Sequence, residues 1–175
     1  MKSPRFGEQW LSQHQLGYVG LDDDDRTAIR EFALLWGIFE SQALFGDGTI
    51  DGMNNYIDEI ARIAEADQRV LLTAPFIPHV AHFRDQYVDS ERATTNGAFE
   101  TLNFKDTGSK VLVRRALVTL NEETPELVKA LLIIVYHLRR RLFQGLKWQR
   151  TCDKQRDDLY HASKVLMKAV DMSIA

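Results

Sequence analysis

The sequence predicts an all-α protein, a single-domain helical bundle that spans residues 1–175. Three observations support this fold class. Apolar side chains recur at helical spacing over long segments, whereas the alternation typical of strands is weak. The chain has only 4 prolines and 10 glycines, and they cluster at a few points. No proline-, glycine- or serine-rich linker and no internal repeat divides it into smaller units.

The composition limits the classes of function. At 175 residues and 45% hydrophobic, the chain can bury one core of ordinary size. Its formal net charge is −3, so binding of a polyanion has to depend on a local basic surface. Cys152 is the single cysteine, which excludes an internal disulfide and a cysteine-based zinc cluster. The longest apolar run, 130–135, is far shorter than the ~20 residues of a membrane span. We therefore expect a cytoplasmic protein with no membrane partner.

The first part of the chain predicts two helices after a polar lead-in, residues 1–21. The run Asp22 to Asp25 provides an N-cap and favourable negative charge for a long amphipathic helix over 24–44. The segment GDGTIDG ends this helix, and a second helix is expected over 53–67. The inward positions of the first helix have helical spacing: Ile29, Phe32, Ala33, Trp36, Phe39 and Ala43.

The middle of the chain is less regular. Pro75 and Pro78 are expected to start or kink a helix over 78–88. Residues 90–110 are polar and carry two glycines, which predicts a long loop of the kind that is often functional or mobile. The segment VLVRRALVTL, residues 111–120, fits either a short helix or a strand, and we favour the helix.

His79 and His82 are three positions apart, a spacing that places two side chains on one helix face. A metal site needs further ligands. Histidines near a proline-containing helix start are more often structural. We therefore expect no metal site here.

The last third of the chain predicts the two central helices. Thr124 is a suitable N-cap, Pro125 suits the first helical position, and Gly145 lies just past the expected end. Residues 127–138 are apolar on nearly every side, which places this helix at the centre of the core. A final amphipathic helix is expected over 153–172, with one apolar face: Leu159, Ala162, Leu166 and Val170.

The central helix ends in an unusual density of positive charge. One or two basic residues near a helix C-terminus are favourable by ~0.3–1 kcal/mol each, but three consecutive arginines point around the helix. At least one must therefore lie near the core, where it needs a partner such as Glu40 or a phosphate. Gln144 and Gly145 add an amide and a backbone turn at the same place. We interpret the end as a phosphate-binding corner, with these basic residues: Arg139, Arg140, Arg141, Lys147, Arg150, Lys154 and Arg156.

The string LLIIVYHLRRRLFQGLKW resembles the signature helix of the HEPN family of small helical domains. Many members carry Arg-Asn-x-Leu-Phe-His-Gly after an apolar helix with Val-Tyr near its end. The next helix often opens with Arg-Asp, as KQRDDLYHASKVLMKAV does, and FALLWGIFES is similar to the first long helix of such domains. The resemblance covers that helix and the C-terminal part of the chain, and it implies a HEPN-like helical bundle.

The resemblance also implies metal-independent RNA cleavage, by two arginine–histidine pairs facing each other across a homodimer, without a cofactor. When the family's motif is aligned with this chain, its arginine corresponds to Arg139. Its histidine corresponds to position 144, where this chain has Gln144. The residue after the arginine, usually asparagine or aspartate, is Arg140. Glutamine has no titratable nitrogen and cannot move a proton near neutral pH. We therefore expect a degenerate member, a pseudo-nuclease that binds RNA or a nucleotide; the family implies a toxin–antitoxin or defence context.

Two alternatives stay open, and with them the question of whether the protein is an enzyme. The segment RDDLYH places Arg156 and His161 at the family's spacing, with Asp157 second, which would make an active metal-independent endoribonuclease. On a regular helix, a separation of five residues places two side chains about 140° apart. Arg156 and His161 could therefore act together only if the helix were distorted. The other alternative is a protein-interaction module whose basic cluster binds a cognate acidic protein, without nucleic acid.

Overall fold

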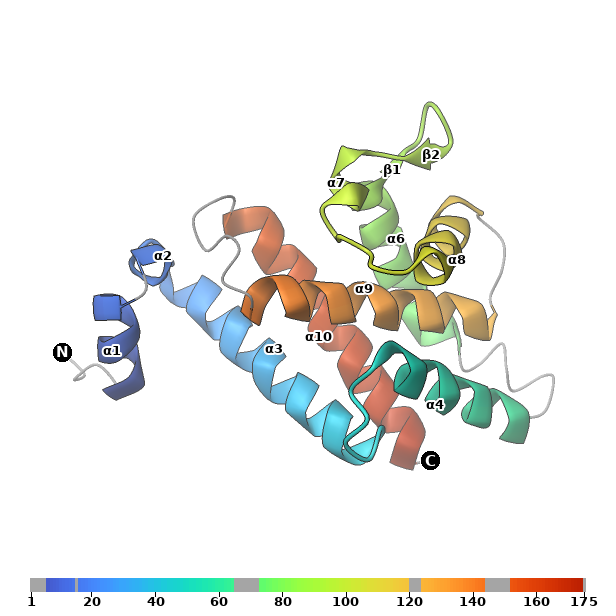
Figure 1. Ribbon diagram of the computed structural model, residues 1–175, viewed down its shortest axis with the longest axis horizontal. Helices are drawn as coiled ribbons and strands as arrows, with labels where there is room; N and C mark the ends of the chain where they lie inside the picture. The colour runs from blue at the N-terminus through green and yellow to red at the C-terminus, as the bar shows by residue number, and fades with distance from the viewer. Residues whose placement is uncertain (1–5, 15, 65–72, 120–123, 144–151, 175) are drawn as a thin grey trace.

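The structure is a computed structural model that describes residues 6–14, 16–64, 73–119, 124–143 and 152–174 (Figure 1). It is mostly helical, at 80%, and forms one domain, which confirms the predicted fold class. The helices are α1 (Phe6–His14), α2 (Leu16–Val19), α3 (Asp23–Gln42), α4 (Ile50–Ile63), the 3-10 turn η1 (Ala74–Phe76), α6 (Ile77–Tyr87), α7 (Gly97–Glu100), α8 (Thr107–Val118), α9 (Pro125–Phe143) and α10 (Cys152–Ile174). The short strands β1 (Val88–Asp89) and β2 (Thr94–Thr95) pair antiparallel.

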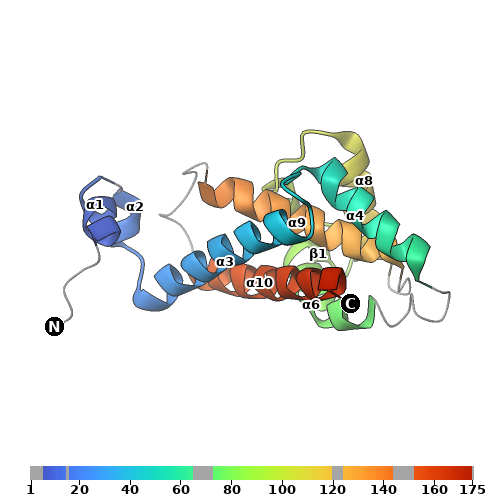
Figure 2. The ribbon, with the colours of Figure 1, turned by 90° about the horizontal axis from the view of Figure 1, so that it is seen from below.

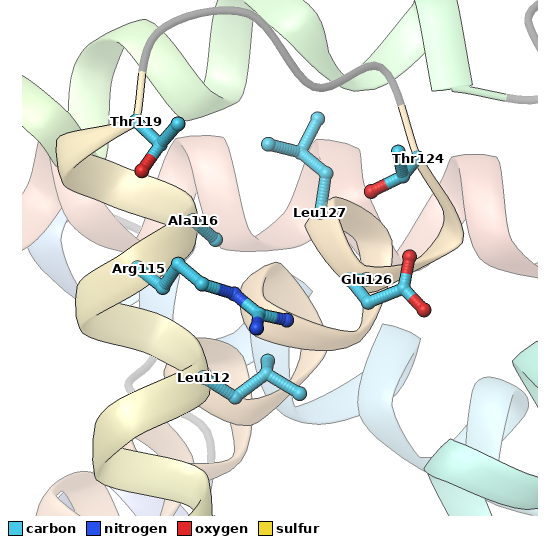
Figure 3. Close-up of a pocket in the computed structure, with 7 residues that line it drawn as sticks. All are labelled: Leu112, Arg115, Ala116, Thr119, Thr124, Glu126 and Leu127. Carbon is cyan, nitrogen blue, oxygen red and sulfur yellow. The ribbon is translucent and has the colours of Figure 1, made fainter.

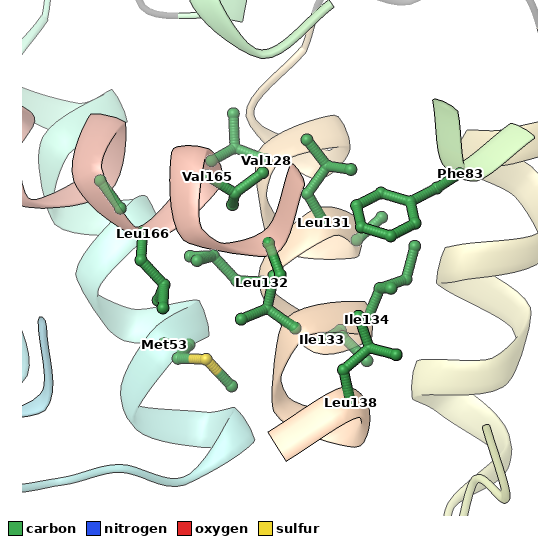
Figure 4. Close-up of a cluster of buried hydrophobic side chains, with 14 of the residues drawn as sticks. Met53, Phe83, Val128, Leu131, Leu132, Ile133, Ile134, Leu138, Val165 and Leu166 are labelled. Atoms are coloured by element: carbon green, nitrogen blue, oxygen red, sulfur yellow. The ribbon is translucent and has the colours of Figure 1, made fainter. Parts of the chain in front are cut away.

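α9 lies at the centre of the core, as its apolar pattern predicts. Figure 4 shows its side chains surrounded by Met53 of α4, Phe83 of α6 and Val165 and Leu166 of α10. Burying one such side chain is favourable by about 1.5–3 kcal/mol, so α9 organises the helices around it. Its buried residues are Leu127, Val128, Ala130, Leu131, Leu132, Ile133, Ile134, Val135, His137, Leu138 and Leu142.

α3 and α10 run parallel and side by side along the molecule, as Figures 1 and 2 both show. Their first turns are joined by Arg156. Its Nε donates to Asp25 Oδ1 at 3.0 Å and one terminal nitrogen donates to Asp22 Oδ2 at 2.8 Å. Asp22 and Asp25 also form the capping box of α3, in which each side chain accepts from the other's backbone N–H. The acidic run expected to cap α3 therefore also anchors α10.

The expectation of a long loop over 90–110 is wrong. β2, α7 and the first turn of α8 lie within this segment. Asn96 and Asp106 are N-caps, whose side-chain oxygens accept from backbone N–H groups two or three residues further on. Phe99 and Leu102, between the two caps, are buried. Polar residues that suggested a loop are thus the starts of two helices.

The other expected elements are present, with shifted ends. The lead-in contains α1 and α2, the helix expected over 53–67 is α4, and the ambiguous segment 111–120 lies mainly in α8. The last residues of the 53–67 prediction, and the predicted cap Gly145, lie outside the described residues.

A small cavity lies where the end of α8 meets the start of α9. Figure 3 shows Arg115 reaching from α8 toward Glu126 across it, with Thr124 and Leu127 on the opposite wall. Its volume is about 10 Å³, which is room for about one water molecule. It is therefore too small for an organic ligand.

We expect Arg156→Met to lower the melting temperature by about 3–6 °C, because it leaves the carboxylates of Asp22 and the buried Asp25 without their cation. Arg62→Met is the matched control. It breaks an ion pair with Glu59 that is exposed on α4, so it should change the melting temperature by about 1 °C or less. Thermal unfolding followed by circular dichroism measures both, and equal shifts would contradict the anchoring role.

Candidate functional site

Arg139 lies near the C-terminal end of α9 and folds onto α3. Its guanidinium carbon is 4.6 Å from the centre of the Trp36 ring and 5.9 Å from that of Phe143. The cation thus lies against two aromatic rings, an arrangement that is attractive. A terminal nitrogen is 4.0 Å from Glu40 Oε2, so the partner that the sequence analysis named as one possibility is confirmed.

Glu40 is itself held in place. The Trp36 Nε1–H donates to its Oε2 at 2.6 Å, so Trp36 both stacks on Arg139 and orients its counter-charge. A Cβ at Gly48 would lie 2.5 Å from Glu40 Oε1, so the turn before α4 closes against this carboxylate. The Arg139 side chain remains 33% exposed, and its Nε is buried without an acceptor. Arg139 is therefore positioned, but its hydrogen-bonding capacity is not used up.

Arg140 and Arg141 extend the positive charge around the same end of α9, and both are half-buried. Arg141 Nη1 donates to the Thr101 hydroxyl at 3.3 Å. Within the described part of the chain, neither arginine forms an ion pair. Phe143, which follows them, is 60% exposed. Arg139 packs against α3 and Arg141 reaches Thr101 at the end of α7, so the three arginines surround the end of α9, with the exposed Phe143 ring on the Arg139 side. We call this end of α9 the arginine surface.

The rest of the predicted corner is not described. Gln144, Gly145, Lys147 and Arg150 lie outside the described residues, and of Lys154 only the backbone position is given. The structure therefore gives no distance between Arg139 and position 144.

The alternative pair, Arg156 and His161, is not brought together. Arg156 turns to the aspartates at the start of α3, whereas His161 faces α6, where its Nδ1 is 3.0 Å from His79 Nδ1. This matches the angle expected on a regular helix.

Sequence reasoning missed the setting of His161, which is a cluster of histidines between α6 and α10. The His161 ring stacks on His82, with centroids 3.9 Å apart and planes 3° from parallel. His82 Nε2 donates to Asp158 Oδ1 at 2.9 Å. The spacing of His79 and His82 indicated a shared helix face, but nothing in the sequence connects that face to His161.

Two rings of the histidine cluster, His79 and His161, have pKa values that are lowered from the usual value. Burial is the largest cause that lowers the pKa of His79 to about 4, and the neighbouring His161 and His82 contribute to the same shift. Burial also lowers the pKa of His161, again with His82, although Asp157 and Asp158 oppose this. Neutral imidazoles supply no charge for a phosphate. Among the described residues, no group of three or more histidine, cysteine or acidic side chains is arranged to hold a metal ion.

His137 is a further buried histidine, on α9 itself. It is 1% exposed, and neither ring nitrogen has a hydrogen-bond partner. Burial, followed by the positive charge of Arg140, lowers its pKa to about 4. Buried away from solvent, His137 is not placed to exchange protons with a ligand at the basic surface.

No family model, curated protein or solved structure matches the chain. In the part of the chain that the structure describes, no helix is both long and apolar enough to cross a membrane.

The buried histidines predict a loss of stability in acid. Their folded pKa of about 4 lies below the value of about 6.5 in the unfolded chain. Between these values the unfolded state binds more protons, so the free energy of unfolding is at its full value above pH 6.5 and falls as the pH drops toward 4. Urea unfolding at several pH values measures this slope.

Replacing His137 isolates its share of that slope. His137→Leu should reduce the difference in unfolding free energy between pH 4 and pH 6.5 by roughly 2–3 kcal/mol, because one buried proton acceptor is gone. His14→Leu is the control, since His14 is exposed on α1. If both variants keep the wild-type slope, burial of His137 does not set the acid sensitivity.

Proposed function

We propose that the chain is a HEPN-like RNA-binding protein, a pseudo-nuclease that holds RNA phosphates at the end of α9 without cutting them. The observation that carries this proposal is the setting of Arg139. Its guanidinium is positioned by Trp36 and Glu40, yet the side chain stays 33% exposed, at the same helix end as Arg140 and Arg141. A planar guanidinium matches the geometry of a phosphate, and pre-positioning reduces the entropy lost on binding.

The aromatic ring at the same surface supports single-stranded RNA as the ligand. Proteins that bind single strands combine a positive surface with aromatic side chains on which bases stack. Phe143 is 60% exposed and lies 5.9 Å from the Arg139 guanidinium carbon. A strand whose phosphate contacts an arginine can therefore place a base near this ring.

Binding without cleavage is the reading that the residues support best. Metal-independent cleavage needs a group that moves the 2′-hydroxyl or leaving-group proton, and position 144 is glutamine. Among the described histidines, His137 is buried behind the arginines and His161 faces α6. Arg156 is engaged by the aspartates of α3, which weighs against the alternative nuclease pair.

The wider role of the protein follows from the resemblance alone. A homodimer would bring two such arginine surfaces together, and a toxin–antitoxin or defence setting would supply RNA or a cognate protein as the partner. These assignments belong to the proposal and need their own tests.

A cleavage assay on mixed cellular RNA in EDTA tests the proposal. The wild-type protein should bind RNA and leave it intact. Gln144→His should gain cleavage, because it restores the proton-moving group, and the double variant Gln144→His/Arg139→Ala should lose this gain. Cleavage by the wild type that His161→Ala abolishes would overturn the proposal in favour of an active nuclease. RNA that is neither bound nor cut by any variant would favour the protein-interaction module.

A further inference from the structure

A groove of about 490 Å³ lies between the first turns of α4 and α8 and the middle of α9. This volume is in the range of sites for small organic ligands. Asp51 and Asn54 of α4 line one side, Asp106 and Ser109 the other, and Ile133 and Tyr136 of α9 lie between them. The groove thus has an apolar wall and polar sides.

The groove is connected to the arginine surface through aromatic contacts. The Tyr136 ring is 6.3 Å from the Trp36 ring, and the guanidinium carbon of Arg139 is 4.6 Å from the centre of the same Trp36 ring. The turn that closes on Glu40 at Gly48 continues directly into Thr49, which also lines the groove. One bound molecule could therefore contact both the groove and the end of α9.

The chemistry of the groove favours a ligand that donates hydrogen bonds. None of the described residues that line it is basic, which disfavours an anion. The Ser109 N–H donates to Asp106 at 2.6 Å and keeps the pKa of that carboxyl below its usual range, so Asp106 stays ionised. Asp51 adds an exposed carboxylate. The Asn54 side chain lines the groove, and its Oδ1 atom is buried without a donor among the described residues. A rotation of this amide that presents Oδ1 to a bound donor would relieve the cost of that unpaired state.

We infer that this groove is a guanine subsite for the RNA held at the arginine surface; this inference rests on the proposed function. Guanine is a flat apolar ring that presents a ring N–H and an adjacent amino group on its Watson–Crick edge, the edge that proteins read in unpaired RNA. Those donors match the Asp51 carboxylate and the Asn54 carbonyl oxygen. The ring then packs on Ile133 and Tyr136, with the phosphate toward Arg139.

Free nucleosides test the subsite without help from a phosphate. Equilibrium dialysis with radiolabelled guanosine measures binding to the full chain, and unlabelled nucleosides compete. Adenosine and 1-methylguanosine, in which the ring N–H is absent or blocked, should compete at least about tenfold more weakly than guanosine, since a buried acceptor is left unpaired. Equal competition by all three, or no binding of guanosine, would overturn the guanine assignment.

A pair of neighbouring asparagines gives a matched control. Asn54→Ala should weaken guanosine binding about tenfold, whereas Asn55→Ala, at an exposed position, should leave it unchanged. Equal effects of the two variants would overturn the role of Asn54, and the nucleoside series above does not depend on any variant folding. RNA binding without guanosine binding overturns only this inference. Guanosine binding without RNA binding overturns the proposed function and leaves a nucleoside site.

Discussion

The burial of α9 on nearly every side between Leu127 and Leu138 is the constraint on which the rest of the structure depends. A helix that is apolar on nearly every side brings most of its charge to the surface near its ends. α9 does so at its C-terminal end, where Arg139, Arg140 and Arg141 follow the apolar run and point to different sides of the helix. The position of the basic surface is thus a consequence of core packing. α3 supplies the residues that contact it, Trp36 and Glu40.

That same packing gives Arg139 an ionic partner. It is covered by Trp36 and compensated by Glu40, both on α3. Part of its charge is therefore neutralised, whereas Arg140 and Arg141 form no ion pair with the residues that the structure describes. Under the proposed function, such a surface would hold a ligand in a defined orientation through Arg139 and attract it through the other two arginines. The groove at Tyr136 would give this ligand a second point of attachment.

Sequence reasoning predicted the features that depend on the spacing and charge of residues close together in the chain. The aspartate cap, the central helix and the need of one arginine for a partner such as Glu40 all follow from spacing and charge. The helices within 90–110 were missed because Asn96 and Asp106 have the composition of a loop and the function of caps. The histidine cluster was missed because His79 and His161 lie 82 positions apart, and only packing of α6 on α10 joins them. The groove was missed for the same reason, because residues from three helices that are separate in the sequence line it.

The salt dependence of RNA binding tests the central claim, that the end of α9 holds phosphates, most directly. Fluorescence anisotropy with a labelled single-stranded RNA, in EDTA and over a range of salt concentrations, gives the slope of log K against log salt. Each phosphate contact contributes about 0.7 to this slope for a single strand. We expect Arg140→Gln to lower the slope by about that amount, while Arg62→Gln, on the exposed face of α4, leaves it unchanged. An identical slope in both variants would contradict the account.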